Sequence, residues 1–106
     1  TDGQPLPDVL QAGRVTIDAG RREIRVDDDP VEFTTKEFEL LRFLAQNRGR
    51  VFTREQLMDR IWGYRDYAGG RVVDSHVARI RRKLREDGNE PRFIRTVHGV
   101  GYAFKE

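Results

Sequence analysis

Cysteine is absent from this 106-residue sequence, methionine occurs once, and no apolar run exceeds two or three residues. The absence of cysteine excludes disulfides, cysteine-ligated zinc and thiol nucleophiles, and it fits a reducing compartment. No stretch approaches the roughly 20 apolar residues of a membrane span, and residues 1–10 lack the regions of a signal peptide. Because the chain begins at Thr1 and its only methionine is Met58, we expect it to be a piece of a longer protein.

Groups for catalysis are scarce as well. His76 and His98 are the only histidines, and Ser75 has no base at a recognisable spacing, so no nucleophilic triad can be composed. The three aspartates at 27–29 precede a proline, which favours a solvated hairpin turn over a metal site. We therefore expect no enzyme, no metal and no cofactor.

Charge is distributed unevenly along the chain, although the net charge is only +2. Residues 1–40 carry five basic and ten acidic side chains, residues 41–70 carry six and three, and residues 71–106 carry nine and five. The positive C-terminal part favours an anionic partner, with nucleic acid ahead of an acidic membrane surface. Seventeen of the twenty cations are arginine, which suits recognition of phosphate and guanine, although a GC-rich genome produces the same bias.

The first part of the chain predicts a linker followed by a small sheet. Residues 1–8 contain two prolines, a glycine and two aspartates, and we interpret them as a linker remnant before a single domain at 9–106. Residues 9–33 alternate apolar and polar side chains with a period of two. Short strands are expected around 15–18, 23–26 and 31–33, with turns at 20–22 and 27–30, forming an antiparallel sheet.

Two capping boxes then predict two helices. Thr34 with Glu37 three residues later starts an apolar pattern of helical spacing that continues to Gly49, a residue suited to ending a helix. Thr53 with Gln56 repeats the box and predicts a shorter helix ending at residue 63.

The remaining elements are a loop, a third helix and a hairpin. Residues 63–70 contain three glycines and no periodicity, which predicts a loop. A helix is expected from Arg71 to about Asp87, where Gly88 follows. Residues 93–97 and 102–104 are strand-prone and flank a glycine-bearing tip. Three helices followed by a hairpin form the winged-helix arrangement of the helix-turn-helix class.

The third helix has two unlike faces when it is placed on a wheel of 100° per residue. Val73, Val77, Ile80 and Leu84 fall on one narrow stripe, which we expect to dock on the core. The opposite face holds small residues in its middle and cations around them. Its members are Arg71, Ser75, Ala78, Arg79, Arg82 and Glu86.

This outward face is interpreted as a surface for DNA. Residues 71–85 contain six cations and one carboxylate, so most arginines lack a partner within the helix. Small residues flanked by arginines allow a helix to enter a major groove. A merely solvated face is the alternative, and a membrane-surface helix is disfavoured because the apolar stripe lacks a wide aromatic sector.

The sequence also resembles the DNA-binding (effector) domain of OmpR/PhoB-type response regulators of two-component systems. The resemblance covers residues 12–104 through FTTKEFELLRFLAQNRGRVFTREQLMDRIWG, VVDSHVARIRRKLR and IRTVHGVGYAF. It implies an α+β winged helix-turn-helix fold with an N-terminal four-stranded antiparallel sheet, a three-helix bundle and a C-terminal β-hairpin wing. It also implies a cytoplasmic transcription regulator with a receiver domain that is missing from this chain.

The resemblance assigns site residues one by one. Residues placed toward base edges are Asp74, Ser75, Ala78, Arg79 and Arg82. Residues placed at backbone phosphates are Arg54, Trp62, Arg71, Arg81, Thr96 and Tyr102. His98 and Gly99 form the wing tip at the minor groove. For Trp62 and Tyr102 we expect packing to be the main role, with contact through a polar edge. His76 is expected to be structural.

Two positions depart from the family pattern. Ala78 stands where relatives often carry a cation, and His98 stands where an arginine often enters the minor groove, so this chain lacks at both positions the cation that the family pattern uses for direct readout. The resemblance further implies tandem DNA half-sites and contact of the loop 63–70 with RNA polymerase, and we expect the isolated domain to be a monomer. A winged helix that lost DNA binding and docks a protein partner is the rival hypothesis.

Overall fold

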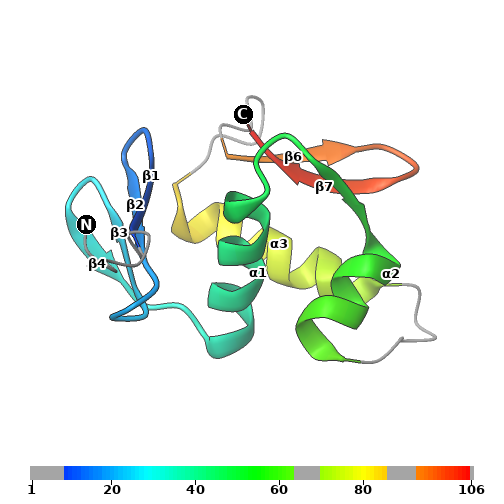
Figure 1. The fold of residues 1–106 in the computed structure, drawn as a ribbon, viewed down its shortest axis with the longest axis horizontal. Coiled ribbons are helices and arrows are strands. Elements are labelled where there is room, and N and C mark those ends of the chain that lie inside the picture. The colour runs from blue at the N-terminus through cyan, green and yellow to red at the C-terminus, as the bar shows by residue number, and fades with distance from the viewer. Residues whose placement is uncertain (1–8, 64–69, 86–92, 106) are drawn as a thin grey trace, which may run out of the picture.

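The structure, a computed structural model, describes residues 9–63, 70–85 and 93–105. Its elements are β1 (Val9–Ala12), β2 (Val15–Asp18), β3 (Glu23–Val26), β4 (Asp29–Val31), α1 (Thr35–Gln46), β5 (Val51–Thr53), α2 (Arg54–Leu57), η1 (Met58–Trp62), α3 (Arg71–Lys83), β6 (Ile94–Val97) and β7 (Gly101–Phe104). Figure 1 shows the β1–β4 sheet at one end, the helices in the middle and the β6–β7 hairpin extending toward the opposite end. The predicted winged-helix arrangement is confirmed. None of the helices in these ranges is long and apolar enough to cross a membrane.

The N-terminal sheet is antiparallel with the strand order β1-β2-β3-β4, as the resemblance implied. Apolar and polar side chains alternate along β2 and β3. The apolar ones, such as Val15 and Ile24, are buried, and the polar ones between them are partly exposed. The expected strand at 31–33 was misplaced, because β4 already begins at Asp29. Asp27 and Asp28 make the turn alone with φ of 53° and 69°, a two-residue geometry that aspartate tolerates and that matches the strand twist. Pro30 is accommodated because β4 is an edge strand.

Both capping boxes are confirmed. In α1, the N–H of Glu37 donates to the Thr34 hydroxyl at 3.2 Å, and the N–H of Thr34 donates to the Glu37 carboxylate at 3.0 Å. The same reciprocal pair at the start of α2 joins Thr53 and Gln56 at 2.9 and 3.0 Å. These bonds satisfy N–H groups that have no partner inside a helix, which explains why both helices begin where the sequence predicts.

The helix ends agree less well with the predictions. Helix α1 ends at Gln46, before the predicted stop at Gly49, whose φ of 80° turns the chain toward β5. The second helix does end at Gly63, but its last five residues form the π-helix η1, which periodicity did not predict. Helix α3 ends at Lys83, and Arg85 has a φ of 60°, which is incompatible with a helix continuing to Asp87. Residues 86–92 lie outside the described ranges.

Strand β5 was missed by the sequence analysis. It pairs with β7, which also pairs with β6, so the expected two-stranded wing is one part of a three-stranded sheet ordered β5-β7-β6. Thr53 lies opposite Gly101 and Val51 lies opposite Ala103. The strand has only three residues and its partner strand lies about fifty positions downstream, so no local sequence pattern predicts it. Through this pairing, β5 attaches the segment between α1 and α2 to the wing.

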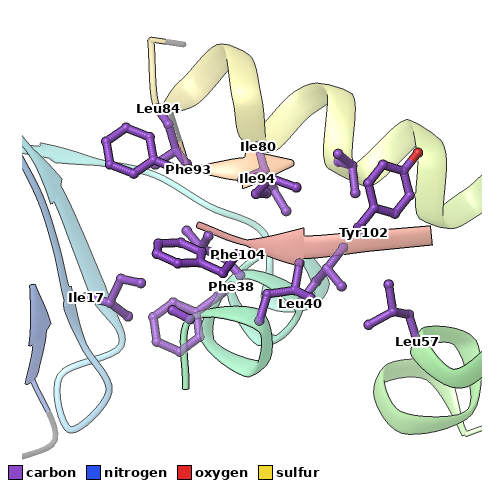
Figure 2. Packing of buried hydrophobic residues seen from close by; sticks show 14 of the residues in the cluster. Ile17, Phe38, Leu40, Leu57, Ile80, Leu84, Phe93, Ile94, Tyr102 and Phe104 are labelled. Carbon is purple, nitrogen blue, oxygen red and sulfur yellow. The ribbon is translucent and has the colours of Figure 1, made fainter. Parts of the chain in front are cut away.

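One core joins the two sheets and the helices. Figure 2 shows Phe104 of β7 lying between Phe38 of α1 and the side chains of α3, with Ile17 approaching from the N-terminal sheet. All are nearly inaccessible to solvent. Because α3 is held by this core along one side, its other side is presented to solvent in a fixed orientation.

A buried carboxylate also ties α3 to α1. Glu37 is 1% exposed and accepts a hydrogen bond from the Lys83 ammonium group in addition to the N–H of Thr34. Burial alone would raise the pKa of Glu37, but the hydrogen bonds from Lys83 and from the Thr34 backbone lower it below the ordinary value of a glutamate.

The lowered pKa predicts a pH-dependent stability. The contribution of the ionised Glu37 is fully present above the unfolded-state pKa and is lost as the pH falls through the lower folded-state pKa. We expect Glu37→Gln to lower the free energy of unfolding by about 1.5 kcal/mol near neutral pH, with the deficit shrinking at pH values below about 4. Urea unfolding of both proteins over this range checks it. A deficit that stays constant with pH would contradict the assigned role of the charge.

Candidate nucleic-acid interface

Helix α3 is oriented as its two faces predict. Val73, Val77, Ile80 and Leu84 are each 0–1% exposed. The side chains on the opposite face that lie within the described residues are exposed, and these are Arg71, Ser75, Ala78, Arg79 and Arg82. Glu86, which was expected on the same face, lies outside the described residues. The docking stripe is therefore confirmed, and the small and basic face points away from the core.

The guanidinium groups of this face are not neutralised by the part of the chain that the structure describes. The side chains of Arg71, Arg79 and Arg82 make no hydrogen bond or ion pair there. By contrast, Arg85 beyond the helix end lies 3.7 Å from Asp27 and 3.6 Å from Asp29 across to the N-terminal sheet. Three cations along one face of α3, none of them paired with an acid among the described residues, raise the local potential, which favours an anionic partner.

Two predicted site residues, Arg54 and Asp74, contact each other. The Nε of Arg54, the first residue of α2, donates to Oδ1 of Asp74 at 2.9 Å. The hydroxyl of Tyr102 on β7 donates to the same oxygen at 2.6 Å. Burial first, and then the bond to Asp74, raise the pKa of Tyr102, so its hydroxyl remains protonated and acts as the donor. The bond to Asp74 raises the pKa of Arg54, which stays charged.

Two further predicted residues, Arg81 and Thr96, join α3 to the wing. Nη2 of Arg81 donates to the Ile94 carbonyl oxygen at 2.8 Å and to the Thr96 hydroxyl at 2.7 Å. The Arg81 guanidinium also lies 5.8 Å from the centre of the Tyr102 ring. These contacts fix the wing relative to the helix, a structural role that the resemblance did not indicate.

Trp62 and His76 pack against each other. Their rings meet edge-on at 4.9 Å between centroids, and Nδ1 of His76 lies 2.8 Å from the Val72 carbonyl oxygen. His76 thus has the structural position that was expected. Trp62 is partly exposed, and Tyr102 is only 6% exposed, so both rings are engaged mainly in packing, as expected.

The wing tip is exposed. His98, Gly99 and Val100 form the turn between β6 and β7, and Val100 is 49% exposed. Gly99 has a φ of 80°, the left-handed region that a non-glycine residue rarely adopts. Figure 1 shows this tip at the end of the hairpin, away from the N-terminal sheet. The tip is therefore free to reach beyond the body of the domain.

Two residues that support the site were missed by the sequence analysis. A Cβ on Gly70 would lie 2.7 Å from the Cβ of Arg54, so the glycine leaves room for the stem of that arginine. Nη2 of Arg14 donates to the Arg85 carbonyl oxygen at 2.7 Å and covers the end of α3. Neither contact could be predicted from a local sequence pattern, because each joins residues that are distant in sequence.

Comparison with known proteins defines the class. Residues 28–104 match the family described as transcriptional regulatory protein, C terminal. The chain belongs to this family and is a winged-helix DNA-binding domain of the OmpR/PhoB-type transcriptional response regulators.

Individual relatives agree with this assignment. The sensory transduction protein RegX3 of Mycolicibacterium smegmatis is 46% identical over 95 residues, which cover 89% of this chain and 41% of that protein. The Thermotoga maritima response regulator DrrB, an OmpR/PhoB homologue, has a TM-score of 0.84 at 39% identity, covering 92% of this chain and 44% of its own. The Klebsiella pneumoniae RstA DNA-binding domain, solved in complex with the RstA box, has a TM-score of 0.84 at 31% identity, covering 92% and 96%. This chain therefore spans less than half the length of RegX3 and DrrB.

Proposed function

We propose that this domain binds double-stranded DNA sequence-specifically, with α3 in the major groove and the wing tip at the minor groove. The observation that carries the proposal is the exposed arginine face of α3, which lies opposite its buried stripe and lacks acidic partners among the described residues. Arginine in a major groove reads guanine and contacts phosphate. The RstA DNA-binding domain, which was solved in complex with the RstA box, has the same fold, and this supports the proposal that the present domain binds DNA.

The roles proposed for individual residues follow their exposure. Ser75, Ala78, Arg79 and Arg82 face the bases, together with Asp74. Arg71 and the outer nitrogens of Arg54 contact phosphates. Arg81, Thr96, Trp62 and Tyr102 lie close to the backbone of the DNA. The contacts of Arg81, Thr96 and Tyr102 mainly hold α3 and the wing together, whereas Trp62 mainly packs against His76 of α3. His98 and Gly99 approach the minor groove.

The proposal for the whole protein extends to its partners. We propose a receiver domain joined through residues 1–8, tandem DNA half-sites, and contact with RNA polymerase through the loop 63–70, of which residues 64–69 lie outside the described ranges. The isolated domain is proposed to be monomeric, to act without catalysis and to work in the cytoplasm, where bacterial chromosomes lie.

Selection of bound sequences from a random DNA pool tests the function. The expected result is one enriched motif, bound at least about a thousandfold more tightly than random DNA. A pool that shows no enrichment, together with no gel shift at low salt, would overturn the proposal and favour the protein-docking rival.

Arg79 provides a sharper prediction. Because this side chain is exposed in the middle of the α3 face, Arg79→Ala is expected to weaken binding to the selected site by about 1–3 kcal/mol and to relax selectivity at one base pair. Titration of selected and random DNA measures both effects. The matched control is Arg71→Ala, which should weaken binding to selected and random DNA alike. Equal losses on both DNAs for the two variants would refute the assignment of Arg79 to base readout.

A further inference from the structure

Asp74 is the only acidic residue of α3, and it lies in the first turn of that helix. Residues near the start of a recognition helix are the ones that reach base edges. A carboxylate in a DNA groove is unfavourable beside phosphates unless it is compensated. The side chain of Asp74 nevertheless remains 40% exposed while it is paired with Arg54.

The two oxygens of Asp74 differ in their bonding. Oδ1 accepts both from Nε of Arg54 at 2.9 Å and from the hydroxyl of Tyr102 at 2.6 Å. Oδ2 accepts no hydrogen bond from any residue that the structure describes. Two donors on one oxygen fix the rotation of the carboxylate, so the second oxygen is held ready to accept a hydrogen bond from a partner.

Arg54 is held as well. A Cβ on Gly70 would lie 2.7 and 2.8 Å from the Cβ and Cδ atoms of Arg54, so the stem of the arginine lies directly against the glycine. Since only Nε bonds to Asp74, the outer nitrogens remain available to a phosphate. Arg54 therefore offsets the charge of Asp74 and connects the DNA backbone to a residue at the bases.

An oxygen that only accepts hydrogen bonds selects among base edges. Guanine presents N7 and O6 and thymine presents O4 in the major groove, and these acceptors repel a carboxylate. Adenine offers its N6 amino group beside the acceptor N7, whereas the N4 amino group of cytosine has no acceptor on its own base edge beside it. Cytosine is thus the base that fits.

We propose that Asp74 is a specificity-determining residue whose Oδ2 accepts a hydrogen bond from the N4 amino group of one cytosine, while Arg54 and Tyr102 hold the carboxylate in place. This inference rests on the proposed function, because it requires α3 to lie in the major groove. In this proposal, a negatively charged side chain contacts a base beside the positively charged arginines of the same helix face.

The test compares selection by the wild-type domain with selection by Asp74→Asn. Wild type should require cytosine at one position, with other bases binding about 5- to 150-fold more weakly. Asparagine pairs with adenine through N6 and N7, so Asp74→Asn should move the preference at that position toward adenine. A general loss of structure would not produce such a change of base. Asp59→Asn removes an exposed acid of η1 and serves as the matched control that keeps cytosine.

A second measurement uses only the wild-type protein. Each cytosine of the selected site is replaced in turn by 2-pyrimidinone, which lacks the amino group, and one replacement should weaken binding about tenfold or more. The proposal is overturned if no cytosine is sensitive, or if folded Asp74→Asn selects the wild-type base at every position. If the wild-type domain selects no sequence at all, the proposed function itself has failed, which is a different outcome.

Discussion

Replacing Gly101 by alanine is expected to lower the free energy of unfolding by about 3 kcal/mol or more. A Cβ at this position would lie 1.9 Å from the carbonyl oxygen of Phe52 and 2.9 Å from the Cα of Thr53. Both atoms belong to the backbone of β5, which pairs with β7 at this point. Backbone cannot rotate away as a side chain can, so β5 must separate from β7 or the pairing must be lost.

Thermal unfolding followed by circular dichroism measures this effect, which corresponds to a fall in Tm of roughly 10–20 °C for a domain of this size. Gly63→Ala is the matched control, because Gly63 has a φ of 81° but a Cβ added there would meet no atom within 4 Å. That variant should lose only about 1 kcal/mol through backbone strain. Similar losses in both variants would show that the clash with β5 is not the cause.

DNA binding is expected to weaken by about 500-fold when the salt concentration rises from about 50 to about 200 mM, if the domain makes about five phosphate contacts. Each neutralised phosphate releases condensed counterions, which gives a slope near −0.9 in log K against log salt for every contact. The exposed arginines of α3 and the outer nitrogens of Arg54 supply the cations. Fluorescence anisotropy with a labelled duplex over this salt range measures the slope.

Single substitutions then locate the contacts. Arg71→Ala should make the slope less steep by about 0.9, because it removes one phosphate contact. Arg21→Ala removes an exposed cation from the turn between β2 and β3 and should leave the slope unchanged. A wild-type slope near zero would contradict an electrostatic DNA interface, and a change in slope for Arg21→Ala would place the DNA on another face.

Features set by neighbouring residues could be predicted from the sequence. The starts of α1 and α2 follow from Thr34 and Thr53, whose side chains bond to backbone groups three residues away. The buried stripe of α3 follows from the helical period, which returns Val73 and Val77 to the same side. Such signals are complete within a few residues, so they do not depend on the rest of the fold.

Features that join distant residues could not be predicted from the same patterns. Strand β5 exists because β7 lies beside it, and α3 ends at Lys83 while Arg14 covers the following turn. At the site, base and phosphate roles were assigned to Asp74 and Arg54 separately. The structure shows them bonded to each other across 20 positions of sequence.

The amino-acid sequence alone determined where the helices begin and that the last of them, α3, has a basic face, because capping motifs and periodicity are local properties. Only the tertiary structure decided that β5 completes the wing sheet, that Arg81 holds the wing to α3, and that one oxygen of Asp74 is occupied by Arg54 and Tyr102. Each of these contacts forms only after the core has brought separate segments together. Local sequence patterns therefore do not predict which distant polar groups will contact each other.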